Sequence, residues 1–279
     1  MKNLLLLLMF LSTIGFSQVA VLVVGPQEDG TQDAIYEMKK IGVYLKSQGV
    51  HLKTFYGNNA NWNEIRKASN GASFFIYSGH GGSLGENGNA GGLFLTNPVS
   101  SQDIVNDLHL KRNSVVIFKS VCNGAGSSAG DDGDIGINEA TKRVTYYSKP
   151  FFEVGAACYY ANNLEDGCLD FLKDFFEGKT IKECFINSTQ SWWTQTTTRN
   201  GVTTEEKVLG EDPQADIEFE KSYKYNRKMN ISIASTNWGG SSTLTTYRNG
   251  VKTVKQVPSS KGYSIAYVSD PNFSIIKLK

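Results

Sequence analysis

The chain has 279 residues, of which 40% are hydrophobic and 20% are charged, so it is long and apolar enough to bury the core of one large domain. Lys and Arg total 28 against 27 for Asp and Glu, and the formal net charge of +1 argues against a protein built to bind nucleic acid or an anionic membrane. The apolar content also excludes a disordered chain.

The N-terminal residues have the pattern of a secretory signal peptide. Lys2 supplies a short basic region, residues 4–11 supply an apolar core, and Gly15 and Ser17 are small residues placed for cleavage before Gln18. The apolar run is shorter than the roughly 20 residues that span a bilayer. We therefore expect an exported protein, secreted or periplasmic, without a membrane span.

Strands and helices alternate in the region that follows. Residues 19–25, "VAVLVVG", form an expected buried strand, and residues 31–49 carry apolar side chains at helical spacing and end on a glycine that suits a C-cap. The alternation continues through a strand, a helix and a strand at 50–57, 61–69 and 72–79. Such alternation predicts right-handed crossovers and a parallel sheet.

Two residues with useful chemistry come directly after two of these strands. His80 follows the strand at 72–79, and Cys122 follows a Val/Ile/Phe-rich buried strand at 114–121. If the two strands are parallel neighbours, their ends lie roughly 4.8 Å apart, and if a third strand intervenes the distance doubles. A glycine-rich stretch, a short strand and a helix are expected between them at 80–92, 93–96 and 100–110.

The remainder of the chain changes composition near Glu205. Before that residue we expect a helix, a strand and one or two amphipathic helices at 137–148, 152–160 and 164–190. After it the chain is rich in Thr, Ser, Tyr and Val, and "TLTTYRNGVKTVKQV" predicts a hairpin that turns at Asn249-Gly250. No internal repeat or heptad pattern is expected. The predicted organisation is a signal peptide at 1–17, an α/β domain at 18–219 and a small β-rich C-terminal appendage at 220–279.

The four cysteines are too few for a disulfide scaffold in a chain of this size, and no CxxC pair indicates zinc or a redox motif. They are Cys122, Cys158, Cys168 and Cys184. One pair could bridge, for instance Cys168 with Cys184. The presence of any cysteine that is not part of a disulfide then needs another explanation.

Cys122 and His80 together suit nucleophilic catalysis. A cysteine attacks as the thiolate, and a nearby imidazole lowers the thiol pKa and acts as general base and later as general acid. Glycines flank both residues and leave room for a substrate backbone, and the backbone N–H groups of Gly81 and Cys122 are candidate donors to an oxyanion. The flanking glycines are Gly79, Gly81, Gly82 and Gly124.

The two blocks "YSGHGG" and "SVCNGAG", each after an apolar strand, resemble the caspase-like cysteine peptidases, which include caspases, metacaspases, legumains and gingipains. "YSGHGG" is most similar to metacaspases, whereas the secretory context is more similar to gingipains and legumains, and "VLGEDP" at 208–213 resembles a segment near the end of the gingipain catalytic domain. The resemblance covers about residues 19–215, and only the two blocks are specific. It implies an α/β fold, namely a caspase-like three-layer α/β/α sandwich with a mostly parallel sheet, to which the small C-terminal all-β appendage is added.

The resemblance also implies the roles of the site residues. Cys122 becomes the nucleophile, His80 the general acid and base, and Gly81 an oxyanion donor beside the Cys122 N–H. The expected activity is that of an exported cysteine endopeptidase that acts on a peptide or protein substrate, and this chemistry requires no cofactor. Val121 departs from the Ala or Cys that many members of the family have before the nucleophile, which leaves the subfamily open.

An acidic segment follows the cysteine and has three interpretations. Asp131, Asp132 and Asp134 could form an acidic subsite that favours Lys or Arg before the scissile bond, as the resemblance to metacaspases and gingipains implies. Clustered carboxylates on a loop also suit calcium, although the spacing does not match an EF-hand. The third interpretation is a solvated loop.

Other residues support an alternative without catalysis, in which the chain is a peptidase-like or carbohydrate- or protein-binding secreted module. Trp192, Trp193 and Trp238 could form a sugar-binding platform or fill a core. Cys158 is either a core thiol or part of a substrate pocket. His51 and His109 are expected to be surface or packing residues, and "GHGGSLG" lacks the third glycine of a dinucleotide fingerprint.

Overall fold

A computed structural model describes most of the chain after the expected signal peptide. The described residues are 18–82, 92–131, 135–163, 166–190, 195–199, 202–206, 215–218, 228–237, 242–248, 251–257, 261–270, 273 and 275–278. The expected signal peptide at 1–17 lies outside them. Within the described residues, no helix is both long and apolar enough to cross a membrane.

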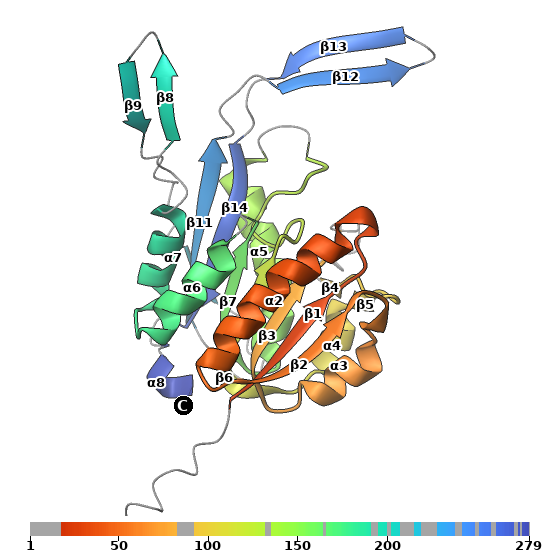
Figure 1. Cartoon of the computed structure of the whole chain (residues 1–279), viewed down its shortest axis with the longest axis vertical. Helices are drawn as coiled ribbons and strands as arrows, with labels where there is room; N and C mark the ends of the chain where they lie inside the picture. The colour runs from red at the N-terminus through yellow and green to blue at the C-terminus, as the bar shows by residue number, and fades with distance from the viewer. Residues whose placement is uncertain are drawn as a thin grey trace, which may run out of the picture.

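One sheet of eight strands runs through the molecule in the order β10-β11-β14-β7-β6-β3-β1-β2 (Figure 1). Its strands are β1 (Val19–Val24), β2 (His51–Tyr56), β3 (Ala72–Ser78), β6 (Leu110–Lys119), β7 (Ala156–Asn162), β10 (Ala215–Glu218), β11 (Lys228–Asn237) and β14 (Lys261–Ser269). The strands β7, β6, β3, β1 and β2 pair in parallel, whereas β14, β11 and β10 pair antiparallel at one side. The parallel part confirms the mostly parallel sheet predicted from the alternating elements.

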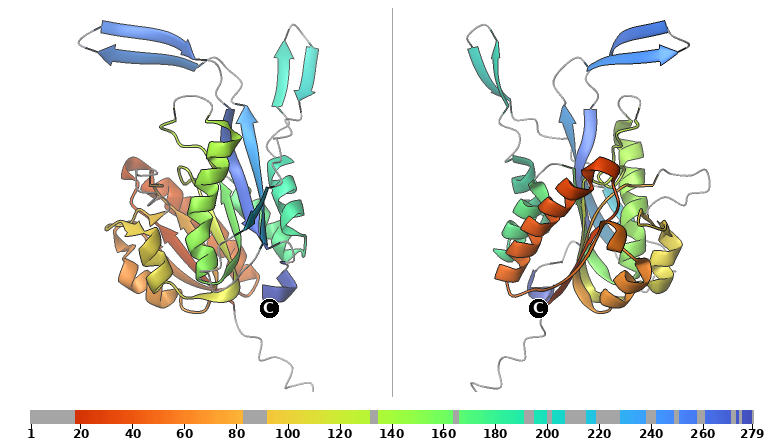
Figure 2. Two further views of the ribbon diagram at one scale, coloured as in Figure 1. Left: turned by 180° about the vertical axis from the view of Figure 1, so that it is seen from behind. Right: turned by 45° about the vertical axis from the view of Figure 1, so that its right-hand side comes forward.

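Helices cover both faces of this sheet (Figure 2). One face is packed by α3 (Trp62–Ala68), α4 (Ser101–Asp107) and α5 (Gly136–Glu153), and the other by α2 (Thr31–Ser47), α6 (Gly167–Phe176), α7 (Ile181–Gln190) and α8 (Ile275–Leu278). Short elements complete the described chain: the 3-10 helices η2 (Glu28–Gly30) and η3 (Gly57–Asn59) and the pair β4 (Gly92–Leu93) with β5 (Val99–Ser100). The arrangement is mixed α/β and is compatible with a three-layer α/β/α sandwich.

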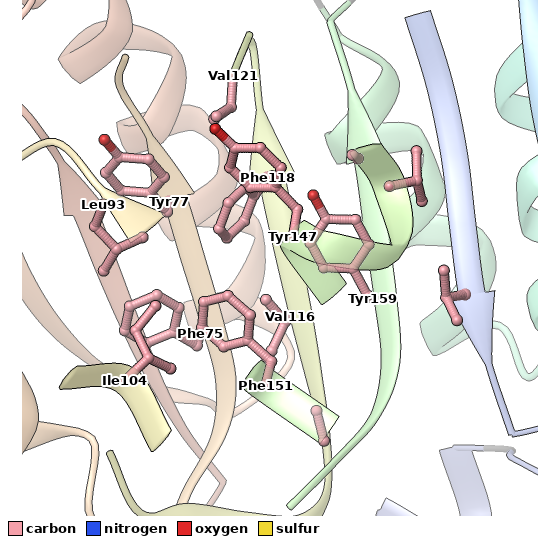
Figure 3. Packing of buried hydrophobic residues seen from close by; sticks show 14 of the residues in the cluster. Phe75, Tyr77, Leu93, Ile104, Val116, Phe118, Val121, Tyr147, Phe151 and Tyr159 are labelled. Carbon is pink, nitrogen blue, oxygen red and sulfur yellow. The ribbon is translucent and has the colours of Figure 1, made fainter. Parts of the chain in front are cut away.

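The centre of the core is aromatic and lies between β3, β6, β7 and α5 (Figure 3). The ring of Phe118 has four aromatic neighbours, Tyr77, Tyr147, Phe151 and Tyr159, at centroid distances between 5.2 and 5.9 Å. Each of these side chains is fully or almost fully buried, and burial of one such ring contributes about 1.5–3 kcal/mol. This packing fixes β3 and β6, the two strands that precede His80 and Cys122.

The boundary expected between a helix at 137–148 and a strand at 152–160 is wrong. α5 continues to Glu153, and β7 begins only at Ala156. Gly155 separates the two elements with a φ of +118°, a left-handed conformation that glycine adopts without strain and that no helix continues through.

The C-terminal region contributes to the main sheet as well as to a separate hairpin. β14 pairs with β7, and β11 pairs with β14, so two strands from 220–279 extend the central sheet. The predicted hairpin around Asn249-Gly250 is present as β12 (Ser242–Arg248) paired with β13 (Val251–Val257). A second separate hairpin, β8 (Gln195–Arg199) with β9 (Val202–Glu206), follows α7.

Candidate active site

The strands that precede His80 and Cys122 are direct neighbours in the sheet. β3 and β6 pair in parallel, with Ser78 opposite Lys119 at their carboxyl ends. His80 lies two residues beyond β3, and Cys122 lies three residues beyond β6, so both follow strand ends at the same edge. No strand separates them, and of the two geometries open from the sequence the closer one is present.

The backbone after β6 turns tightly around Cys122. Ser120 and Asn123 have φ values of +55° and +66°, a left-handed conformation that is uncommon for residues other than glycine. The Gly124 N–H donates to the Val121 carbonyl at 2.9 Å, and the Asn123 N–H donates to the Ser127 carbonyl at 2.8 Å. These bonds hold a strained turn of the kind that often presents functional groups, and Cys122 is half-buried on it.

The turn after β3 lies directly against the Cys122 backbone. A Cβ atom added to Gly81 would lie 1.9 Å from the Cys122 carbonyl oxygen and 2.8 Å from the Tyr147 hydroxyl oxygen. Both distances are far below van der Waals contact, so only glycine permits this approach. The glycine after His80 is therefore required by the contact between the two turns, in addition to any room that it leaves for a substrate.

The Gly82 carbonyl joins the two turns through two hydrogen bonds. It accepts from the Tyr147 hydroxyl at 2.8 Å and from the Asn123 Nδ2 atom at 3.2 Å. Asn123 directly follows Cys122, and Tyr147 comes from α5. We call this arrangement the Gly82 bridge, because it fixes the turn that carries His80 against the turn that carries Cys122.

Tyr147 keeps its proton over a wide pH range. Burial raises the pKa of Tyr147 well above its ordinary value, and a negative charge on the neighbouring Cys122 sulfur raises it further. A neutral phenol is a hydrogen-bond donor, whereas a phenolate can only accept. Tyr147 therefore remains a donor to the Gly82 carbonyl at neutral pH and well into the alkaline range.

A second tyrosine, Tyr77 of β3, binds the backbone of the His80 turn. The Tyr77 hydroxyl donates to the His80 carbonyl at 3.0 Å and accepts from the Phe94 N–H at 2.9 Å. The His80 side chain itself is exposed, so a substrate can reach it. The backbone of His80 is thus anchored while its imidazole remains accessible.

Arg143 of α5 organises the Cys122 turn from the other side. Its Nη1 atom lies 2.9 Å from Asn123 Oδ1, 3.2 Å from the Gly126 carbonyl oxygen and 2.8 Å from an Asp131 carboxylate oxygen, and its Nε atom donates to Glu139 at 3.0 Å. Because Asn123 accepts from Arg143 through its oxygen, its NH2 group is turned toward Gly82. Charge-assisted hydrogen bonds of this kind are stronger than neutral ones, so the orientation of the Asn123 amide is well defined.

The structure gives Asp131 a different partner from the one expected of a substrate subsite. Both carboxylate oxygens lie within 2.9 Å of Arg143 Nη1, one of them also accepts from the Ser128 N–H at 2.7 Å, and the side chains of Asp131 and Arg143 are each 14% exposed. The charge of Asp131 is therefore already compensated inside the protein. Asp132 and Asp134 lie outside the described residues.

The described part of the chain contains no complete set of calcium ligands. No group of three or more His, Cys, Asp or Glu side chains there is arranged to hold a metal ion. Asp131, the one described member of the acidic segment, is bound to Arg143 and does not fit the role of a free ligand. We derive no step through calcium.

The other three cysteines are buried free thiols, and the bridge considered between Cys168 and Cys184 is absent. Burial raises the pKa of Cys158 strongly and raises the pKa values of Cys168 and Cys184 to about 12 each. Cys158 packs in the core on the face of α2, α6 and α7, which agrees with a core thiol. Cys122 is the only one of the four that is not buried.

The remaining histidines lie away from this edge. His51 is the first residue of β2, and His109 directly precedes β6, so both are at the amino ends of parallel strands. Both are exposed, in agreement with the expected surface role. Trp192, Trp193, Trp238 and the "VLGEDP" segment lie outside the described residues.

Comparisons with known proteins assign the chain to no family. No family model matches the chain, and no curated protein matches it. A solved structure titled "Crystal structure of CapF with inhibitor 3-isopropenyl-tropolone" aligns with 91% of this chain and 93% of that chain, at 9% identity and a TM-score of 0.29. A likeness at this level carries no argument about fold or function.

Proposed function

We propose that the chain is an exported cysteine endopeptidase of the caspase-like type, with Cys122 as nucleophile and His80 as general acid and base. The observation that carries the proposal is the direct contact between the two turns, in which the Gly81 backbone lies against the Cys122 carbonyl. A thiol and an imidazole from adjacent strand ends then share one edge of the sheet. Adjacent strand ends support the proposal, because a dyad needs a thiol and an imidazole that can come within hydrogen-bond reach of each other.

The reaction proceeds in two halves. His80 accepts the thiol proton, and the Cys122 sulfur attacks the carbonyl carbon of the scissile bond, so that a tetrahedral oxyanion forms and accepts from the N–H groups of Gly81 and Cys122. The C–N bond breaks as His80 donates its proton to the leaving amine. Water, deprotonated by His80, then attacks the acyl-enzyme, and the thiol regains a proton as the carboxylic acid product leaves.

The preference for a basic residue before the scissile bond needs another source than Asp131. Arg143 already compensates the Asp131 carboxylate, so a cationic substrate side chain would have to compete with a partner that is fixed in the protein. We therefore leave the preferred residue to be determined by a panel of substrates with Lys, Arg, Asn or Asp at that position.

Covalent labelling tests the proposal directly. Residues 18–279 are incubated with peptidyl acyloxymethyl ketones that carry Lys, Arg, Asn or Asp, with and without calcium, and the modified residue is identified by mass spectrometry. We expect one adduct, on Cys122, and none in the Cys122→Ala variant. The Cys184→Ala variant, which lacks a buried thiol, should be labelled as the unmodified chain is.

Two outcomes would count against the proposal. An adduct on Cys158, Cys168 or Cys184 in place of Cys122 would assign the reactivity elsewhere. Complete resistance to labelling by every probe, in a chain whose circular dichroism shows it folded, would favour a non-catalytic binding module.

A further inference from the structure

Two hairpins stand outside the central sheet and project from the same end of the molecule. Hairpin A consists of β8 and β9, and hairpin B consists of β12 and β13. Hairpin B rises between β11 and β14, where Asn237 is paired with Lys261. Figures 1 and 2 show the two hairpins apart from each other and pointing in different directions.

The two hairpins share a short sequence repeat, contrary to our expectation of no internal repeat. Residues 196–204 read TTTRNGVTT, and residues 245–253 read TTYRNGVKT. The strand registers agree as well, because Arg199 pairs with Val202 as Arg248 pairs with Val251, and Thr197 pairs with Thr204 as Thr246 pairs with Thr253. An Asn-Gly turn and threonine suit any hairpin, but neither demands the same Arg-Val pair beside the turn.

The copies differ in charge. Hairpin A ends with Glu205 and Glu206, whereas hairpin B carries Lys252 and Lys255, and Lys255 occupies the position that corresponds to Glu206. The difference extends along the chain: in "EEKVLGEDPQADIEFE" at 205–220 the only basic residue is a lysine, and residues 221–261 contain no Asp or Glu. A net charge of +1 for the whole chain thus conceals an acidic hairpin and a basic one.

Each hairpin also has unpaired strand edges. Among the described strands, β8 with β9 and β12 with β13 are separate two-stranded sheets that join neither each other nor the central sheet. An isolated two-stranded hairpin is marginally stable in water, and an open edge is a template for pairing with a further strand. Because hairpin A is acidic and hairpin B is basic, a strand of one hairpin is the partner whose charge suits the open edge of the other.

We propose that a second copy of the chain is the partner, with β9 of one copy paired antiparallel to β13 of the other. Aligned so that Thr204 lies opposite Thr253, the strands place Glu205 opposite Lys252, a cross-strand pair of opposite charge. Each copy has one hairpin of each kind, so a twofold axis makes the contact twice and closes the assembly as a dimer. The separation of hairpins A and B within one chain favours a second copy over pairing within the same chain.

The base of hairpin B, in contrast to its turn, is joined to a strand that contacts the candidate active site. Tyr263, near the start of β14, accepts from the Ser127 N–H at 3.0 Å and donates its own N–H to Ser127 Oγ at 2.7 Å. Ser127 belongs to the loop that follows Cys122. The strand that follows hairpin B is therefore bonded to that loop, although the dimer does not depend on the proposed peptidase activity.

Disulfide capture tests the pairing. Two mature chains, both with Cys122→Ala, carry either Thr204→Cys or Thr253→Cys, and they are mixed and oxidised with copper phenanthroline. We expect a covalent dimer whose disulfide joins the two substituted positions, shown by mass spectrometry. A chain with both substitutions that forms the disulfide within a monomer, or a mixture without any such crosslink, would overturn the proposal.

Charge reversal provides a second test by sedimentation equilibrium. The substitution Lys252→Glu should weaken the dimer by about tenfold or more, because attraction to Glu205 becomes repulsion at both of the symmetric contacts. Adding Glu205→Lys to the same chain should restore it, and about 0.5 M salt should weaken the unmodified dimer by screening. The exposed Lys67→Glu substitution on α3 is the matched control and should leave the dimer unchanged. A monomer at every concentration and salt, or reversal without effect, would contradict the proposal.

Discussion

The loops that follow β3 and β6 meet at one edge of the sheet but are held in different ways. The loop of Cys122 has backbone hydrogen bonds of its own, which close turns at Gly124 and Asn123, in addition to bonds from Arg143 and Tyr159 of other elements. The described contacts of the His80 turn instead come from side chains of other elements, which bind the carbonyls of His80 and Gly82. The comparison teaches that the Cys122 loop combines local backbone turns with tertiary contacts, whereas the described contacts of the His80 turn come from side chains outside it.

The largest effect is expected at Gly81, where the two loops touch. In Gly81→Ala the new Cβ would lie 1.9 Å from the Cys122 carbonyl oxygen, so the loops must separate. A displacement of about 1 Å at a reacting centre can cost roughly 100-fold in rate, and we expect the rate of Cys122 labelling to fall by at least about that factor. Gly30→Ala is the control, since its Cβ would meet only Gln27 Cβ at 4.0 Å, and its rate should not change. Unaltered labelling in Gly81→Ala would show that this contact does not matter.

The next largest effect is expected from substitution of Arg143, and it should fall mainly on the stability of the fold. Arg143→Met leaves Asp131 and the Asn123 oxygen without their cation in a site where Arg143 and Asp131 are each only 14% exposed. We expect a loss of about 2–3 kcal/mol in the free energy of unfolding, measured by urea denaturation. Arg66→Met removes an exposed pair at 3.9 Å with Asp107 and should cost less than about 1 kcal/mol. Equal losses in the two variants would mean that the Arg143 cluster has no special weight.

A substitution of Asn123 distinguishes two roles of this residue: it joins the Cys122 loop to the His80 turn, and it stabilises the Cys122 turn itself. Asn123→Asp retains an oxygen for Arg143 but loses the NH2 group that donates to the Gly82 carbonyl, and it brings two acceptors together. Asp also tolerates the left-handed φ of +66°. We expect the rate of Cys122 labelling to fall by about tenfold, which is about 1.4 kcal/mol, with a smaller change in the urea midpoint. If the midpoint falls while labelling is unaffected, Asn123 serves the turn alone.

The sequence predicted the strands before His80 and Cys122 because both are uninterrupted apolar runs, a local property. It could not decide that β3 and β6 are neighbours, since the order of parallel strands depends on how the whole sheet packs. Asn123, Arg143 and Tyr147 were missed for a related reason. The contacts of Asn123 reach across 41 residues to Gly82 and 20 residues to Arg143, and no local pattern marks them.

The sequence of the C-terminal region contains a signal that could have been used to predict that β14 lies inside the central sheet. All residues of β14 from Tyr263 to Ser269 are buried, so both faces of this strand are covered. In "YSIAYVS" the apolar residues fall on both alternating positions, which is typical of an interior strand and not of a half-exposed appendage. Its place beside β7 was therefore readable in part, and the repeat in hairpins A and B was readable from residues 196–204 and 245–253 without any structure.

Tyr147 carries the smallest expected effect and the one with a distinct pH dependence. Tyr147→Phe removes one of the two donors to the Gly82 carbonyl, which should cost about 1 kcal/mol at pH 7 and slow Cys122 labelling by a few fold, because Asn123 still holds the bridge. The pKa of Tyr147 is raised in the folded protein, so its contribution to stability is complete below the unfolded value of about 10 and is lost as the pH rises through the folded pKa. Above pH 10 the unfolded chain releases this proton and the folded chain does not, so the unmodified protein loses stability that the Phe variant does not lose. The difference between the two urea midpoints should therefore shrink from pH 9 to pH 11, and a constant difference would mean that Tyr147 ionises alike in both states.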